Sequence, residues 1–588
     1  MSDHNKEIPS IVKGMFFGEI HEEIVFPFPH FNESQREMSK EMCNAVNKFC
    51  ESQVDSVKMD ETSQIPDEIM QGLAGLGLFG LAVEENYGGL NLDYSLYARV
   101  FQEVAGIDGS LATMLGAHQS IGFKALMNEG NAKQKEEWLP KLASGEVVAS
   151  FCLTEPGSGS DAYSIKTKAK KNTDNTYTIN GQKLWITNAG TSGFYSVFCK
   201  TDHEVNGKTV EKISCFIVEK TRTGISFGEK EKKMGIKASE TRAVYFDNVI
   251  VPATNMIGEP GQGFKIAMNV LNTGRLSLGS GCVGGMKVIL KLAINQAKGR
   301  KQFGKSIAEF GLIQDKLAHM AAHCYAAESI VYMSTGQIIK GLKEYSMESA
   351  VCKVYCSEAL WNTIDQAMQI AAGNGYMKEY PYERIMRDSR INLIFEGTNE
   401  ILRCFLALSG IKEPSEDLKE VGKAADVSKA LQDPIKSLGV LSDFAKKRIG
   451  KMVSTKHLTK VHPSLQEHAD DFIPMLNDFS IKVENSLMKH GSKIIDQELV
   501  QMRLANMVIE LYVSIAVMSR STSILNDPKI SDDDKAYISG LTEIALKESR
   551  HKFMENAKRM DKNYDREVKT VTEALTQRES YGLDIINF

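Results

Sequence analysis

The chain has 588 residues, of which 42% are hydrophobic and 25% charged, enough apolar material for several buried cores. Its 70 basic and 75 acidic residues leave a formal charge of −5, so a nucleic acid is not expected as a partner. Ten cysteines without a CxxC pair favour neither a disulfide framework nor a zinc site. The opening MSDHNKEIPS fits neither a secretory signal nor a transit peptide, and no apolar run has the length of a membrane span, so we expect a cytoplasmic protein.

The first part of the chain is patterned as helices and the next hundred residues as strands. Between Glu68 and Gly80, apolar residues recur at three- and four-residue steps, as in an amphipathic helix. From Phe151 the period changes to two, and apolar residues on both sides of Asn180 and Gly181 predict a β-hairpin there. The pattern therefore predicts an N-terminal arm, a helical domain and an inserted β domain, at residues 1–31, 32–150 and 151–262.

The helical period returns at Phe264 and holds for most of the remaining chain. Ile289, Ala293 and Ala297 fall on one face of a long helix, with polar residues opposite. A stretch rich in Lys, Glu, Asp and Ser then has the composition of a linker, and further apolar stripes follow it. We expect a mainly α protein with a β-barrel-like middle domain, followed by a helical bundle, a linker and a C-terminal helical bundle extension, at residues 263–411, 412–434 and 435–588.

The segment GRKQFGKS, from Gly299 to Ser306, fits the phosphate-loop pattern letter for letter. That motif requires a buried strand before a flexible loop, whereas here an amphipathic helix precedes residues with bulky side chains. The glycines of GEPGQG, at residues 258–263, also lack the spacing of a dinucleotide fingerprint. We therefore expect neither a nucleotide hydrolase nor a Rossmann domain.

Two segments of the β domain suggest cofactor binding. ASFCLTEPGSGSDA, from Ala149 to Ala162, combines Pro and Gly with hydroxyl side chains, as an anion or the edge of a flavin ring requires; an ordinary Gly/Ser loop is the alternative. KLWITNAG places Trp185 and Thr187 on one strand, where an indole can stack on a planar cofactor. A tryptophan in a β core is the alternative reading of that strand.

A third segment, RINLIFEGTNEILR, suggests a general base. Glu396 follows an apolar run and precedes Gly397, and Thr398 is placed to cap the next helix. Apolar surroundings destabilise an ionised carboxylate, so the pKa of Glu396 should rise toward the range useful to a base. The alternative is a glutamate that complements the dipole at the start of a helix.

Together and in this order, these segments resemble the acyl-CoA dehydrogenase family. The resemblance extends from about Phe16 to Gly410 and includes LNTGR, GRKQFG, MGIKASETRAVYFDNVIVP and QIAAGNGYMKEYPYERIMRD. GMFFGEI, LGAHQSIGF and the helical extension make the chain most similar to the very-long-chain branch of the family. That branch also includes a respiratory complex assembly factor.

The resemblance implies that FAD binds between the β domain and the helical bundle. Part of the site would come from a neighbouring subunit, so at least a dimer, most simply a homodimer, is expected. Residues implied to line or pack on the flavin are Phe151, Leu153, Thr154, Ser160, Trp185, Thr187 and Thr398; those implied to hold the adenosine and pyrophosphate of the neighbouring FAD are Arg300, Phe303, Gln369 and Gly373.

The resemblance also implies the reaction. Glu396 would remove the α-proton of an acyl-CoA while the β-hydrogen leaves as hydride, giving a trans-2-enoyl-CoA in fatty acid β-oxidation. The thioester oxygen would be polarised by the Glu396 amide and a flavin ribitol hydroxyl. Electrons would pass to electron transfer flavoprotein. Residues implied to contact the acyl-CoA are Ser160, Asn272, Arg275 and Gly397.

Chain length, membrane contact and a second role stay open at this point. Small residues at Gly116, Ala117 and Gly122 leave room for a long acyl chain, or else allow close helix packing. Residues 434–462 carry a narrow apolar stripe flanked by lysines, which predicts peripheral contact with an anionic inner membrane face; a surface helix is the alternative. An acyl-CoA oxidase and an assembly or scaffold factor are the competing functions.

Overall fold

The computed structural model describes residues 8–425 and 457–587. By their contacts, the residues divide into two compact units. The first comprises Met1–Ser10, Glu23–Leu402 and Ala516–Ala545, and the second Ile11–Glu22, Arg403–Ile515 and Leu546–Phe588. The C-terminal region predicted as one separate extension is therefore shared between both units.

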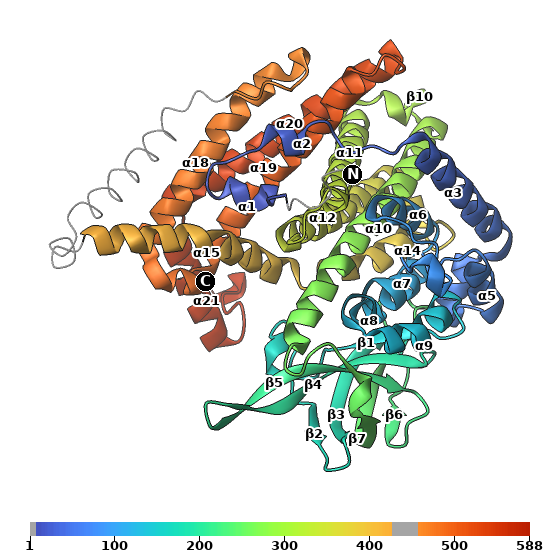
Figure 1. Cartoon of the computed structure of the whole chain (residues 1–588). Coiled ribbons are helices and arrows are strands. Elements are labelled where there is room, and N and C mark those ends of the chain that lie inside the picture. Colours follow the sequence, from blue (N-terminus) through green and yellow to red (C-terminus); the bar gives the residue numbers. More distant parts are fainter. Residues whose placement is uncertain (1–7, 426–456, 588) are drawn as a thin grey trace, which may run out of the picture. The chain divides into compact units, whose positions relative to one another are not determined.

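The N-terminal helices begin where polar side chains cap them. Asp93 accepts hydrogen bonds from the amides of Ser95 and Leu96, and Asp108 from those of Ser110 and Leu111. The α7 helix runs directly into a π-helical turn, η2, at Ala117–Gly122. The helices before the sheet (Figure 1) are α1 (Ile11–Met15), α2 (Glu22–Val25), α3 (Glu33–Gln53), α4 (Ser56–Thr62), α5 (Asp67–Gly75), α6 (Tyr94–Ile107), α7 (Gly109–Gly116), α8 (Lys124–Glu129) and α9 (Ala132–Ala143).

The middle domain is one sheet with the strand order β6-β7-β3-β2-β4-β5-β8, and β1 pairs in parallel with β4. Among the described residues this path does not close into a barrel. The β domain is present as predicted, and its sheet is open. Its strands are β1 (Ala149–Cys152), β2 (Lys168–Lys171), β3 (Thr176–Thr187), β4 (Phe194–Val205), β5 (Lys208–Glu219), β6 (Ile225–Phe227), β7 (Thr241–Pro252) and β8 (Met256–Ile257).

The hairpin predicted at Asn180 and Gly181 is wrong. These residues lie inside β3, which continues to Thr187, and the register with β7 shifts there as in a β-bulge. Gly181 has φ +146°, and a Cβ at this position would lie 2.5 Å from the Thr167 hydroxyl. The glycine therefore serves close backbone approach. The tight hairpin lies at Asn206 and Gly207, both with positive φ, between β4 and β5.

Long antiparallel helices form the rest of the first unit's core. α10 packs against α6, α11 and α12, and a small hairpin of β9 and β10 joins α10 to α11. The GRKQFGKS segment therefore forms the end of a helix and this hairpin, which confirms that it is no phosphate loop. The elements are α10 (Gly263–Gly299), β9 (Lys301–Gln302), β10 (Lys305–Ser306), α11 (Gly311–Ile339), α12 (Ser346–Ala371), α13 (Gly373–Tyr376) and α14 (Tyr382–Ser389). The next helix, α15 (Asn399–Ala425), begins in the first unit and belongs to the second from Arg403.

The predicted linker at 412–434 is helical at its start, because α15 continues through Pro414 to Ala425. Residues 426–456, which include most of the predicted membrane-binding stripe, lie outside the described residues. The chain is described again from residue 457. The last helices are α18 (Gln466–His490), α19 (Glu498–Leu525), α20 (Asp532–Asp561) and α21 (Asp565–Arg578).

Two helices of the described chain, α10 and α19, have the length and mean hydropathy of a membrane span. Of their most apolar windows, 56% and 83% is buried inside the protein. Core helices of this kind are apolar because they pack against other elements, so hydropathy alone gives them no second role.

Candidate active site

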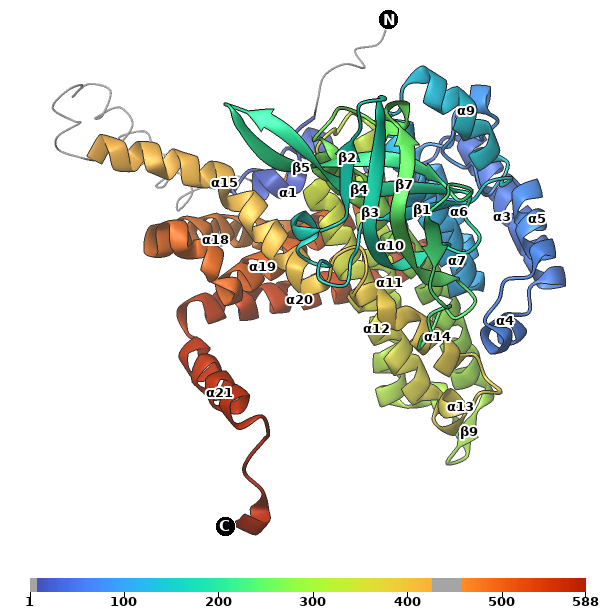
Figure 2. The same ribbon diagram turned by 90° about the horizontal axis from the view of Figure 1, so that it is seen from below.

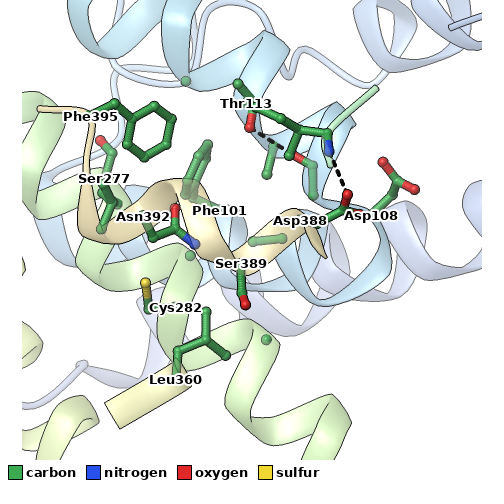
Figure 3. A pocket seen from close by; sticks show the side chains of 18 of the residues that line it. Phe101, Asp108, Thr113, Ser277, Cys282, Leu360, Asp388, Ser389, Asn392 and Phe395 are labelled. Atoms are coloured by element: carbon green, nitrogen blue, oxygen red, sulfur yellow. Dashed lines mark hydrogen bonds between the residues drawn. The ribbon is translucent and has the colours of Figure 1, made fainter. Parts of the chain in front are cut away.

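A cleft in the first unit has about 1030 Å³ of empty space, including the part open to solvent. One wall is the face of α10 that carries Gly274, Ser277 and Gly281, and the opposite wall comes from α6, α7 and η2. In Figure 3, Phe395 and Ser277 lie toward one end of the cleft, and Asp108 and Asp388 toward the other. Glu396 and Thr187 also line it, so the third motif and the β domain meet here.

The backbone that carries Glu396 is a strained turn. Glu396 has φ +60° and Gly397 φ +94°, between a 3₁₀ turn at Arg390–Leu393 and the start of α15. A non-glycine residue in this region is disfavoured unless its surroundings hold it. Thr398 caps α15 as predicted, since its hydroxyl accepts from the amide of Ile401 at 3.4 Å.

Two buried cations hold this turn by its carbonyl groups. Arg275 Nε donates to the Glu396 carbonyl at 3.1 Å, and its Nη1 donates to Asn272 at 2.9 Å. Lys353, fully buried on α12, donates from Nζ to the Gly397 carbonyl at 2.8 Å and to Asn399 Oδ1 at 2.7 Å. Two consecutive carbonyls are thus fixed by charge-assisted hydrogen bonds.

The Glu396 carboxylate is shielded from water. Its Oε2 atom is buried and makes no hydrogen bond within the described chain. A Cβ at residue 274 would lie 2.8 Å from that oxygen, so the glycine of LNTGR makes room for the carboxylate. Burial raises the pKa of Glu396 to about 7, against the lowering effect of Arg275 and Lys353. The expected pKa shift is confirmed, and a carboxylate with this pKa is suited to general-base chemistry.

A buried ion pair fixes the TEPGSGSD loop against β3. Lys183 Nζ contacts Glu155 at 2.7 Å and the Leu153 carbonyl at 3.0 Å, and the Leu184 amide donates to the Thr154 carbonyl. The predicted flavin-lining residues of this segment differ in burial: Leu153 is buried, Phe151 and Thr154 are half-buried, and Ser160 is exposed. Their contacts with a flavin stay predictions.

Trp185 is not a core residue. Its side chain is 63% exposed, its φ is +57°, and it lies where the register between β3 and β7 shifts. Thr187, two residues on, lines the cleft, and its carbonyl accepts from Ser150 at 2.8 Å. An exposed indole beside the wall of an apolar cleft fits a planar ring such as the FAD isoalloxazine, with Thr187 at its edge.

The four residues assigned to a neighbouring subunit's FAD are all exposed, namely Arg300, Phe303, Gln369 and Gly373. Phe303, at the tip of the β9–β10 hairpin, is 94% exposed, and Tyr376 at the end of α13 is 82% exposed. Figure 2 places β9 and α13 at the same end of the bundle. Lys316 near the start of α11 also donates to Gln366 near the end of α12. Their role at a neighbouring FAD stays a prediction.

Sequence reasoning missed Lys353 and Asn399. Lys353 stands alone among apolar residues in the run AVCKVYC, and a lysine buried within a helix requires a polar partner. That signal could have marked it, although not its partner. The substrate contacts predicted for Asn272, Arg275 and Gly397 stay predictions. The hydrogen bonds seen for these residues join them to one another, to the Glu396 turn, to Lys353 and to Ser349.

Comparisons with known proteins agree with this site. Family models of the N-terminal, middle and C-terminal domains of acyl-CoA dehydrogenases match residues 33–146, 150–249 and 261–409. The model of the ACAD9/ACADV C-terminal domain matches residues 463–581. The mitochondrial very long-chain specific acyl-CoA dehydrogenases of Rattus norvegicus and Homo sapiens are each 42% identical over 531 residues, covering 89% of this chain and 80% of the relative.

Solved structures give the same result. An acyl-CoA dehydrogenase complexed with FAD from Bacillus anthracis is 31% identical with a TM-score of 0.79, over 98% of this chain and 96% of that chain. Butyryl-CoA dehydrogenase from Megasphaera elsdenii is 36% identical with a TM-score of 0.60, over 64% of this chain and 97% of that chain.

The buried Glu396 carboxylate, together with Trp185 and Thr187 at the cleft wall as a surface for a planar ring, is typical of flavin-dependent dehydrogenases. The chain belongs to the acyl-CoA dehydrogenase family, which three consecutive domain matches show. It uses FAD to oxidise acyl-CoA thioesters.

Proposed function

We propose that this protein dehydrogenates long-chain acyl-CoA to trans-2-enoyl-CoA and passes the electrons to an electron transfer flavoprotein. The observation that carries the proposal is the shielded Glu396 carboxylate at the head of a long apolar cleft. A solved neighbour titled as an electron transferring flavoprotein, from Acidaminococcus fermentans, is 32% identical with a TM-score of 0.61 over 65% of this chain and 99% of that chain. That title and the very-long-chain relatives support the acceptor and the substrate class.

The chain's own residues provide the base, its orientation and a dry site. Glu396 accepts the α-proton at its unpaired Oε2, and the Arg275 and Lys353 hydrogen bonds keep the carboxylate turned into the cleft. No hydrogen bond of the described chain uses the Glu396 amide, which is free to polarise the thioester oxygen and so acidify the α-carbon. Bound FAD supplies the hydride acceptor for the β-carbon.

Purified protein, loaded with FAD, should lose its flavin colour when titrated anaerobically with acyl-CoA thioesters. The extent and rate should rise from butyryl- to palmitoyl-CoA, because each buried methylene contributes about 0.8 kcal/mol. Slow reoxidation in air, with fast reoxidation by an electron transfer flavoprotein, is the expected outcome. Rapid peroxide formation would instead identify an oxidase, and a protein that no acyl-CoA bleaches would contradict the proposal.

The cleft has the length that a long acyl chain requires. Cleft-lining positions on α10 run from Gly274, beside the base, to Val288, and this span of the helix is about 21 Å. Gly116 and Ala117 line the cleft as predicted for its floor, whereas Gly122 does not and instead packs closely against Ala117 and Ala149. Gly116 and Ala117 therefore fit the reading as room for an acyl chain, and Gly122 fits the reading as close helix packing.

Gly281 lies about halfway along this face, and a Cβ there would lie 3.3 Å from both Ala105 and Phe101. We expect Gly281→Leu to fill the cleft and to lower kcat/KM for palmitoyl-CoA by about 100-fold, with butyryl-CoA within about threefold. Gly281→Ala, with a fraction of the added volume, is the matched control. Equal losses for both substrates would show that the cleft does not hold the chain.

We also propose that the functional unit is a homodimer, because exposed Phe303 and Tyr376 give one end of the bundle an apolar surface. Analytical ultracentrifugation of the FAD-loaded protein should give twice the chain mass at micromolar concentration. A monomer that retains FAD would argue against a cofactor site completed by a second copy.

A further inference from the structure

A second cavity lies behind the acyl cleft. It is lined by residues of α6, η2, α8, α10 and α11. Like the cleft it is partly open, and it has about 660 Å³ of empty space, including the part open to solvent, which is room for a small polar group. Ser120 and Ser277 line both the cleft and this cavity, so the two spaces adjoin at these side chains. Both hydroxyls donate back to carbonyls of their own helical segments, at Gly116 and Thr273.

The wall of this cavity carries a buried ammonium group. Lys124, the first residue of α8, is 8% exposed, and its Nζ lies 5.6 Å from the centre of the Tyr94 ring. Within the described part of the chain, no carboxylate forms an ion pair with Lys124. Asp93 lines the same cavity, but its carboxylate accepts from the amides of Ser95 and Leu96 and from Gln35. Buried charges are normally paired with an opposite charge, whereas the side-chain partner seen for Lys124 in the described chain is the Tyr94 hydroxyl, to which it hydrogen-bonds.

The surroundings of Lys124 are suited to an anion. The hydroxyls of Ser120, Ser277, Ser280 and Thr273 lie around the cavity, together with the Tyr94 ring. Burial has the largest single effect and raises the pKa of the Tyr94 hydroxyl, but the Lys124 charge together with hydrogen bonds to Tyr345, Thr273 and Lys124 outweighs it, so that the pKa lies below its usual value. The Lys124 charge therefore acts across the cavity wall, without a protein carboxylate to neutralise it.

The position of the cavity relates it to the substrate. Gly274 contacts the Glu396 carboxylate, Ser277 lies one turn further along α10, and Ser280 two turns, which places the cavity wall about 5 to 9 Å along the helix from the base. An acyl chain that passes between Ser120 and Ser277 would bring its far end to Lys124.

We propose that the Lys124 cavity binds the terminal carboxylate of acyl chains that carry a second carboxyl group, so that ω-carboxyacyl-CoA thioesters form a substrate class of this active site. The inference rests on the proposed acyl-CoA dehydrogenase function and extends it. A carboxylate there would pair with the ammonium beside the Tyr94 ring. Acyl chains without a second carboxylate remain in the long apolar cleft.

The test compares matched thioesters on the FAD-loaded full chain. For hexanedioyl-, octanedioyl- and dodecanedioyl-CoA, and for the monocarboxylic thioesters of equal length, kcat/KM is measured for wild type and Lys124→Met. For the best-fitting dicarboxylic length, we expect Lys124→Met to lower kcat/KM by about tenfold or more, the loss typical of a buried charged partner. For the monocarboxylic thioester of equal length, kcat/KM of the variant should stay within about twofold of the wild-type value.

Two further measurements keep the result independent of folding and turnover. Lys124→Arg, which keeps the charge, should retain most of the preference for the dicarboxylic chain. Binding of a non-oxidisable 3-thia analogue of the same ω-carboxyacyl-CoA, followed by the change in the flavin spectrum, should weaken in Lys124→Met by a similar factor. Free acetate, titrated up to high concentration, should compete neither with the dicarboxylic thioester nor with its 3-thia analogue.

Other outcomes overturn the inference. If Lys124→Met lowered kcat/KM equally for both classes of thioester, or left it unchanged for both, Lys124 would not recognise the second carboxylate. Competition by acetate without any dicarboxylic preference would assign the cavity to a free anion. In either case wild type would still oxidise monocarboxylic thioesters, whereas failure of the proposed function would show as no bleaching by any acyl-CoA.

Discussion

Glu396→Gln should leave the protein folded and yellow with FAD, and acyl-CoA should no longer bleach it. The amide has nearly the shape of the carboxylate, so the turn and its two carbonyl hydrogen bonds should survive. It cannot accept the α-proton, and loss of a general base typically costs about 10² to 10⁴ in rate. Because the α-proton is a weak acid, we expect the upper end of that range. Anaerobic stopped-flow absorbance with palmitoyl-CoA measures it.

The nearby Glu400, exposed in the first turn of α15, gives a matched control: the flavin of Glu400→Gln should be reduced at the wild-type rate. In the wild type, kcat/KM should fall as the pH drops through about 7, since the raised pKa leaves Glu396 protonated below that value. Rapid bleaching of Glu396→Gln, or a wild-type profile flat between pH 6 and about 8, would remove Glu396 from the role of base.

The base could be predicted from local sequence because its chemistry is local. The apolar run before Glu396 predicted a shielded carboxylate with a raised pKa, and Thr398 marked the start of the next helix, whereas the positive φ of Glu396 was not predicted. The groups that hold the turn could not be predicted in the same way. Arg275 and Lys353 reach it from helices more than 40 residues away, and only the packing of α10 and α12 brings them there.

Two Asn-Gly pairs show why local rules fail in the sheet. Asn206 and Gly207 form the tight turn that the dipeptide favours, whereas Asn180 and Gly181 sit inside β3. The difference is tertiary, because β3 pairs with β7 from Thr176 to Thr187 and with β2 at Tyr177–Asn180, and needs a residue without Cβ where Thr167 approaches. Trp185 is similar: strand patterning allowed a core position, but the register shift turns it outward.

Substitution of Lys353 should have the second large effect on the rate of flavin bleaching. Lys353→Met removes the donor to the Gly397 carbonyl and one of the donors to Asn399, which leaves the Gly397 carbonyl without this partner beside a strained turn. An unsatisfied buried acceptor costs about 1–3 kcal/mol, and the turn can relax to avoid it by moving Glu396. We expect the rate of flavin bleaching to fall by about 100-fold, with KM nearly unchanged because Lys353 does not line the cleft.

The pH profile of kcat/KM distinguishes an effect of Lys353 on the pKa of Glu396 from a purely structural role. The charges that act on Glu396 are Arg275 from α10 and Lys353 from α12, and both lower its pKa against the effect of burial. Removing the Lys353 charge should therefore move the acid limb of kcat/KM to higher pH. Asn399→Ala, which removes one acceptor but keeps the charge, should slow bleaching without moving that limb. If Lys353→Met slowed the reaction and left the limb in place, its ammonium would only support the fold, and Arg275 alone would tune the base.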